Sequence, residues 1–199
     1  MKLYLIRHGE TEINQKGSRF QGMIDIPLNE TGLRQAMEAR DAFQKKNIAF
    51  QHVIASPLSR AFETVRIVSG FPAEQILTDE RLLEQDFGPY EGHVWGDMNP
   101  RTLYALLHDP LNYFPPEAGM ESVIHVVQRA SLFLQDMKRR ADEFQGNVLA
   151  GAHGGSIRGM LVTLHELDIN KFWEYRMGNC AWYELTLRNG DFMVTARSE

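Results

Sequence analysis

The sequence predicts an α/β fold in three layers, α/β/α, around a mixed central sheet that is mostly parallel. Short apolar runs alternate along the chain with longer segments of helical periodicity, an order typical of parallel strands joined by helices. Near the C-terminus two strand-like segments flank Asn189 and Gly190, a pair that favours a tight hairpin, so the sheet must also contain antiparallel strands. No internal repeat or linker divides the chain, and we therefore expect residues 1–199 to form one domain.

The expected strands are the short apolar runs, and helices on both sides are expected to bury them. They lie at residues 3–6, 52–55, 76–78 and 147–152, followed by the hairpin segments 182–187 and 192–196.

The helices follow from apolar periodicity and from capping residues. We expect a helix at 31–46 capped by Asn29 or Thr31, and a second that uses Ser56 as cap and Pro57 in its first turn. Further helices are expected near 101–107, at 122–144 behind the cap Ser122, and at 155–164, whereas the rest of 84–121 reads as irregular. The apolar faces of the first two helices carry Leu33, Ala36, Met37 and Phe43, and Leu58, Ala61, Phe62, Val65 and Val68.

Composition and charge argue against several classes of protein and of partner. The chain is 43% hydrophobic, which suffices for a full core without disulfides, and its one cysteine, Cys180, fits a cytoplasmic location. No segment approaches the roughly 20 apolar residues of a membrane-spanning helix. A formal net charge of −5 disfavours nucleic acid and anionic membranes as partners. Any anion must therefore be bound by a local cluster of cations.

Such a cluster follows the expected strands. Arg7 and His8 come directly after the first strand, Arg60 follows the second closely, Glu84 lies past the third, and His153 follows the strand at 147–152. In sheets of this kind, ligands bind at the carboxyl ends of the strands. The sequence therefore predicts that these side chains meet at one edge of the sheet.

Their chemistry fits a phosphoryl group. The guanidinium forks of Arg7 and Arg60 match phosphate oxygens, and the amide of Gly154 lies at a helix start that favours anions. Asn14 can donate a further hydrogen bond. A neutral His8 is a competent nucleophile, and Glu84 can protonate the leaving alkoxide and later accept a proton from water.

These residues lie in motifs that resemble the histidine phosphatase (phosphoglycerate mutase-like) superfamily. The likeness covers nearly the whole chain and is carried by Leu5-Ile6-Arg7-His8-Gly9-Glu10-Thr11, Asn14, Phe20-Gln21-Gly22, Asp25, Leu28, Ser56-Pro57-Leu58-Ser59-Arg60-Ala61, Glu84, Phe87-Gly88-Pro89-Tyr90-Glu91-Gly92 and His153-Gly154-Gly155-Ser156-Ile157-Arg158. The sequence departs from the pattern at Ile13, where relatives often carry an aromatic residue, and we expect this to affect packing only.

The resemblance implies that His8 is the phosphorylated residue and that Arg7, Arg60 and His153 complete the phosphate pocket. It also implies that Glu84 is the proton donor and that Gln21 and Gly22 lie near the substrate. Glu91 and Asp86 compete with Glu84 for the proton-donor role. The remaining histidines have no metal-ligand spacing, so neither a metal nor another cofactor is expected.

Two reactions remain compatible with this pocket, ester hydrolysis and phosphoglycerate mutation. A mutase must also bind a carboxylate, yet Arg101 is the one arginine or lysine between residues 85 and 121. This segment is instead rich in aromatic residues, which favours a less charged leaving group and therefore a phosphatase acting on small phosphate esters. These aromatic residues are Phe87, Tyr90, Trp95, Tyr104, Tyr113 and Phe114. Three other cations could still reach the mouth of the pocket: Arg129, Arg158 and Arg176.

The main alternative is a cofactor-dependent phosphoglycerate mutase, for which 2,3-bisphosphoglycerate would be the priming phosphoryl donor. A remote alternative is an inactive module that binds phospholigands. The terminal hairpin offers an edge strand, which is a candidate surface for a homodimer.

Overall fold

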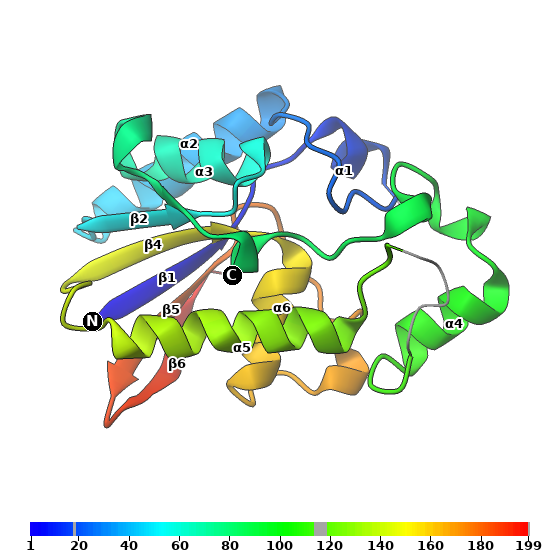
Figure 1. The fold of residues 1–199 in the computed structure, drawn as a ribbon. Coiled ribbons are helices and arrows are strands. Elements are labelled where there is room, and N and C mark those ends of the chain that lie inside the picture. The colour runs from blue at the N-terminus through cyan, green and yellow to red at the C-terminus, as the bar shows by residue number, and fades with distance from the viewer. Residues whose placement is uncertain (18, 114–118, 199) are drawn as a thin grey trace.

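The centre of the molecule is a six-stranded sheet with the strand order β3-β2-β4-β1-β5-β6 (Figure 1). The computed structural model describes residues 1–17, 19–113 and 119–198. The strands are β1 (Lys2–Arg7), β2 (His52–Ala55), β3 (Leu77–Thr78), β4 (Asn147–Ala152), β5 (Trp182–Arg188) and β6 (Asp191–Arg197). Strands β1 to β4 pair in parallel, whereas β5 pairs antiparallel with both β1 and β6. The predicted mixed, mostly parallel sheet is confirmed.

Helices cover both faces of this sheet, so the predicted three layers are also confirmed (Figure 1). Because side chains alternate along a strand, Leu3 and Leu5 of β1 point to one face and Tyr4 and Ile6 to the other. The first face packs against α5 (Val123–Arg139) and α6 (Gly154–Thr163), and the second against α2 (Glu30–Lys45) and α3 (Ser59–Ser69).

A third apolar cluster lies beyond the carboxyl ends of the strands and supports the loops there. It joins α4 (Pro100–His108) to buried aromatic residues such as Phe20 and Phe172. The ring of Phe20 stacks on that of Trp95, with centroids 5.3 Å apart. The short helix α1 (Glu12–Lys16) follows β1 directly. Single turns of 3-10 helix complete the chain: η1 (Ala73–Gln75), η2 (Glu80–Leu82), η3 (Gly88–Tyr90), η4 (Trp95–Asp97) and η5 (Ile169–Lys171).

The structure corrects three details of the expected helices. Helix α3 begins at Ser59, with Leu58 rather than Ser56 at the N-cap. Met37 on α2 is 47% exposed, because the buried face of that helix is formed by smaller residues and Phe43. Helix α5 ends at Arg139 instead of continuing to residue 144. The expected caps Asn29 and Ser122 accept hydrogen bonds from the first-turn amides of α2 and α5.

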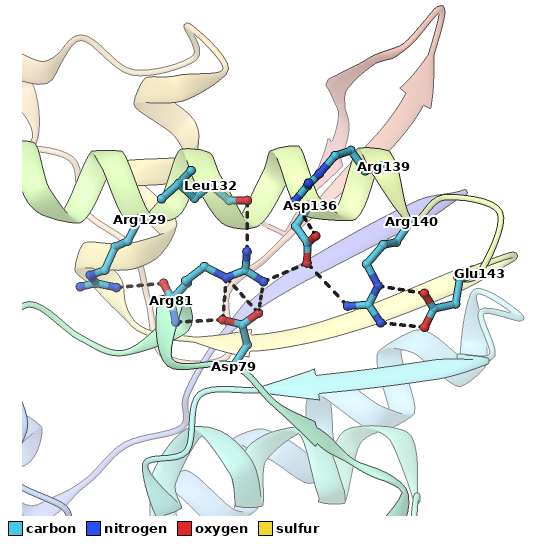
Figure 2. A network of polar contacts seen from close by, with 8 residues as sticks. All are labelled: Asp79, Arg81, Arg129, Leu132, Asp136, Arg139, Arg140 and Glu143. Carbon is cyan, nitrogen blue, oxygen red and sulfur yellow. Dashed lines mark hydrogen bonds and ion pairs between the residues drawn. The ribbon is translucent and has the colours of Figure 1, made fainter.

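A network of ion pairs fastens the chain after β3 to helix α5 (Figure 2). Arg81, in η2, contacts both Asp79 and Asp136, and Asp136 also pairs with Arg139 and Arg140 on its own helix. This network fixes the start of the segment that carries Glu84.

Candidate active site

The order of the sheet brings the two histidines of the predicted site together. Strands β1 and β4 are neighbours whose register places Arg7 beside Ala152, so His8 and His153 leave the sheet at the same edge. The amide of His8 donates to the carbonyl oxygen of Ala152 at 3.1 Å. The centroids of the two imidazole rings lie 5.1 Å apart, and both residues are buried.

The hydrogen bond of His8 fixes which ring nitrogen is free. Its Nδ1 lies 2.7 Å from the carbonyl oxygen of Gly9, and a carbonyl can only accept, so Nδ1 carries the proton. Burial is the main cause that holds the pKa of His8 well below its usual value, and the charges of Arg7 and Arg60 lower it further. The ring is therefore neutral near pH 7, with the lone pair on Nε2.

His153 is held by a residue that follows the neighbouring strand. Its Nε2 lies 2.8 Å from Oγ of Ser56, and Ser56 comes directly after β2. Burial and the nearby Arg60 lower the pKa of His153 well below its usual value. The Nδ1 atom of His153 is buried and has no hydrogen-bond partner within the described part of the chain.

The two arginines of the predicted site bond to main-chain carbonyls rather than to carboxylates. Arg60 is fully buried and donates to the carbonyl oxygens of Gly22 and Ile24 at 2.7 and 2.8 Å. Arg7 donates to the carbonyl oxygen of Met177. Burial lowers the pKa of both groups, in Arg60 to about 10. Among the residues that the structure describes, no carboxylate is therefore in direct contact with either positive charge.

Glu84 reaches the site from the segment after η2 and meets the first turn of α6. Its Oε1 accepts hydrogen bonds from the amides of Gly155 and Gln85 at 2.8 and 2.9 Å. A Cβ atom on Gly155 would lie only 2.4 Å from this oxygen, which explains why glycine stands there. Because both amides bond to Oε1, Oε2 is the oxygen that can carry a proton.

Asn14, Gln21 and Gly22 line the same side of the site. Oε1 of Gln21 accepts from Asn14 Nδ2 at 3.3 Å and from the hydroxyl of Thr11 at 3.2 Å. Gly22 has a φ of +51°, and its carbonyl oxygen is one of the two that hold Arg60.

The two carboxylates that compete with Glu84 for the proton-donor role are bonded elsewhere. Oε1 of Glu91 accepts from the amides of Met23 and Phe87 at 2.7 and 3.1 Å. Asp86 accepts from the amide of Gly88 at 2.7 Å. Neither side chain lines the cavity that contains His8 and Glu84.

The predicted residues surround a cavity of about 660 Å³. Its lining includes Arg7, His8, Asn14, Gln21, Gly22, Glu84 and Gly154. Arg60 and His153 do not line the cavity themselves. The charge of Arg60 lowers the pKa of His8, and the ring of His153 lies next to that of His8.

The mouth of the cavity is richer in cations than the sequence suggested. Arg19, Arg158 and Arg176 line it, whereas Arg101 and Arg129 do not. The expectation rested on residues 85–121, but these arginines come from other segments. Of the three cations that the sequence left open for the mouth, Arg158 and Arg176 line the cavity and Arg129 does not.

The aromatic residues expected at this mouth have different environments. Phe87 and Trp95 line the cavity, together with Phe20 and Trp173. Tyr104 is 67% exposed and does not line it, and Tyr113 is buried in the third apolar cluster. Phe114 lies outside the described residues.

Several buried donors at the site have no partner within the described residues: Nε of Arg7, Nε of Arg60 and Nε2 of Gln21. Buried polar groups are normally hydrogen-bonded, so a concentration of unpaired donors around one cavity indicates a site built for an anion. Across the described residues no group of three or more metal-ligating side chains is placed to hold a metal ion, and no helix could span a membrane.

Sequence reasoning missed two residues that position the histidines. Ser56 was assigned to a helix cap, although its place directly after a strand next to β4 was a signal for the site. Asn179 donates from Nδ2 to the carbonyl oxygen of His8 at 3.0 Å. No motif marks Asn179.

Comparison with known proteins agrees with this geometry. The sequence model of the histidine phosphatase superfamily (branch 1) matches residues 3–199. A protein of Hydrogenobacter thermophilus named "Putative phosphoserine phosphatase 2" is 33% identical over 92% of this chain and 88% of its own. A 2,3-bisphosphoglycerate-dependent phosphoglycerate mutase of Parvibaculum lavamentivorans is 34% identical over 83% of this chain and 80% of its own.

A solved structure is similar over the whole fold. A phosphoserine phosphatase variant from Entamoeba histolytica, in complex with phosphoserine, has a TM-score of 0.83 and 26% identity. The match covers 98% of this chain and 95% of that one.

Proposed function

The chain belongs to branch 1 of the histidine phosphatase superfamily, and from this premise we propose that it is a phosphomonoesterase that hydrolyses small phosphate esters through a phosphohistidine on His8. The resemblance that the sequence motifs indicated is confirmed by the match over residues 3–199. The observation that carries the proposal is the neutral His8, with Nε2 free, among buried donors that have no acceptor of their own.

In the first step, Nε2 of His8 attacks phosphorus and the bond from phosphorus to the ester oxygen breaks. Arg7, Arg60 and His153 stabilise the negative charge on the phosphoryl oxygens, assisted by Asn14, Gln21 and the amide of Gly154. The lowered pKa of His8 supports its role as nucleophile, because a protonated His8 could not attack.

Glu84 completes both half-reactions. Its Oε2 gives a proton to the leaving alkoxide and then takes one from the water that attacks the phosphohistidine. The products are the alcohol and inorganic phosphate, and His8 returns to its neutral form. The bonds from Gly155 and Gln85 to Oε1 support this role, because they orient the carboxyl group.

The cavity favours esters whose remaining part carries a second anionic group. Arg19, Arg158 and Arg176 line it, and Glu84 is the one carboxylate among the described lining residues. A compact alkyl phosphate with a carboxylate, such as phosphoserine or 3-phosphoglycerate, fits this distribution of charge.

The test is a hydrolysis profile over alkyl and aryl phosphates with native protein and His8→Ala. We expect His8→Ala to lower turnover at least about 1000-fold, because no other group can accept the phosphoryl group. Brief incubation with a ³²P-labelled ester should label the native protein through an acid-labile bond and leave His8→Ala unlabelled. His125→Ala is the control, since this histidine is exposed on α5. Full turnover by His8→Ala would contradict the proposal.

The phosphoglycerate mutase alternative is favoured by the arginines at the mouth and by the related mutase. Its test is isomerisation of 3-phosphoglycerate primed with 2,3-bisphosphoglycerate. Isomerisation faster than ester hydrolysis would replace the phosphatase proposal. An inactive phospholigand-binding module would bind esters and turn over none.

We further propose that the enzyme is cytoplasmic and needs neither a metal nor another cofactor, nucleic acid or membrane. Activity should survive dialysis against EDTA. The edge strand β6 is the candidate surface for a homodimer, which light scattering after gel filtration would test.

A further inference from the structure

Arg129, on α5, uses its whole guanidinium group to hold the segment that carries Glu84. Nη1 donates to the carbonyl oxygens of Arg81 and Leu83 at 3.0 and 2.6 Å, and Nη2 donates to that of Glu84 at 3.1 Å. The other two donors reach the carboxylate oxygens of Glu121 at 2.8 and 3.0 Å. An arginine has five N–H donors, so none remains for a ligand.

Glu121 and Gln85 fix the main chain on the C-terminal side of Glu84. Nε2 of Gln85, which is fully buried, donates to the carbonyl oxygen of Glu121 at 2.8 Å. The amide of Glu121 donates to the carbonyl oxygen of Asp86 at 2.7 Å. The main chain is thus fixed on both sides of the glutamate, and the segment has little freedom to shift.

We propose that Arg129 is a positioning residue for Glu84. Its guanidinium group, which is held by Glu121, fixes the position of the main chain from which the carboxyl group of Glu84 reaches the leaving oxygen. The inference rests on the proposed role of Glu84. Proton transfer depends on hydrogen-bond distance, so a shift of about 1 Å in this main chain would impair it.

Two observations separate this role from direct binding of substrate. Arg129 does not line the cavity that contains His8. It lines a second cavity of about 560 Å³, which shares Glu84 and also contains Glu121. The side chains of Arg129 and Glu121 are only 17% and 18% exposed, so their ion pair is largely shielded from water.

The test compares an alkyl ester with an activated aryl ester. Arg129→Lys keeps the charge but loses the fork. We expect its kcat to fall about 10- to 100-fold on phosphoserine, whose alkoxide needs a proton, and at most about 3-fold on p-nitrophenyl phosphate, whose leaving group needs little help. KM should change little for either ester.

Arg81→Gln is the matched control. Arg81 ties the same segment to α5 through Asp136 and the carbonyl oxygen of Leu132 (Figure 2). The hydrogen bonds of its side chain go to these two residues and to Asp79, and none goes to the main chain of Glu84. This variant should lower the melting temperature and leave the ratio of the two kcat values unchanged. A changed ratio in Arg81→Gln would mean that any tether matters, which would overturn the specific role of Arg129.

Glu84→Gln, assayed in parallel, separates the two proposals. If it slows release of the alcohol in the first turnover equally for both esters, the proposed proton donor is wrong, because this step precedes the attack of water on the phosphohistidine. If it slows phosphoserine selectively while Arg129→Lys does not, the positioning role is wrong and the proposed function stands. The double variant should lose no more activity on phosphoserine than Glu84→Gln alone. Glu121→Gln, which opens the fork, provides the same test if Arg129→Lys does not fold.

Discussion

Two arginine clusters in this protein have opposite surroundings. In the network on α5, Arg81 and Arg140 face carboxylates, and these contacts raise the pKa of both guanidinium groups (Figure 2). At the candidate active site, Arg60 and Arg158 donate to main-chain carbonyls, and burial lowers the pKa of each to about 10. The same side chain contacts carboxylates in one region and, among the described residues, makes no ion pair in the other.

The difference indicates which arginines can contribute binding energy to a ligand. A guanidinium paired with a carboxylate contributes to folding and has little left to offer a ligand. A buried guanidinium bonded to carbonyls costs free energy in the free protein, and in the proposed reaction the phosphoryl group of the substrate would supply a negative charge beside it. The cations that bind substrate should therefore be those whose removal harms catalysis more than stability.

Between the two arginine clusters, the largest expected effect concerns Arg60. Replacement by methionine, Arg60→Met, should lower kcat/KM about 100- to 1000-fold, as for the loss of one donor that stabilises a transition-state oxyanion. Inorganic phosphate or vanadate should raise the melting temperature of the native protein and not that of the variant.

Arg81→Met is the matched change in the other cluster. We expect kcat/KM within about 2-fold of the native value and a loss of about 1 kcal/mol in the free energy of unfolding, measured with urea. If Arg60→Met were as active as Arg81→Met, the contrast between the clusters would have no functional meaning.

A second, smaller effect concerns pH. The folded-state pKa values of His8 and His153 lie well below the ordinary value of 6.5, so only the unfolded chain takes up protons on these residues as pH falls below 6.5. Their contribution to stability is present above this pH and is lost as pH falls towards the folded pKa values. Between pH 7.5 and 5.5 the free energy of unfolding should drop by about 2–3 kcal/mol, or about 1.4 per histidine.

The variant His8→Asn tests how much of this drop is due to His8. It removes one buried imidazole, and asparagine can still donate towards the carbonyl oxygen of Gly9. Urea unfolding at both pH values should show about half of the native drop. A drop unchanged from the native one would show that His8 does not titrate in this way.

Sequence reasoning predicted the fold because its signals were local. The apolar runs end sharply at Arg7, Ser56 and His153, and in a parallel sheet such ends must lie at one edge. The same reasoning placed the caps Asn29 and Ser122 correctly, since each depends on a few neighbouring residues.

The remainder of the site depends on contacts between distant segments. Ser56 before a proline fits a helix cap as well as a partner for His153, and only the pairing of β2 with β4 distinguishes them. The charge at the mouth was underestimated because Arg19 and Arg176 come from loops whose place no local pattern fixes. From the sequence alone, Arg129 was also a candidate cation at the mouth of the cavity. Its five hydrogen bonds in the structure exclude this role.

The smallest expected effect belongs to Asp136, the centre of the α5 network. Hydrogen bonding from Arg81 is the main cause that lowers the pKa of this carboxyl, so its stabilising contribution is present above about pH 3.8 and is lost as pH falls through the folded value. Asp136→Asn should lower the free energy of unfolding by about 1 kcal/mol at pH 7, where three arginines each lose one acidic partner, and leave kcat/KM unchanged. The gap between the native protein and the variant, measured by urea unfolding, should persist at pH 5.5 and close below about pH 4. Because the contribution of the histidines begins to fall below pH 6.5 and that of Asp136 only below about pH 4, the two onsets distinguish the clusters. A gap that closed already at pH 5.5 would mean that Asp136 is not held ionised by its arginines.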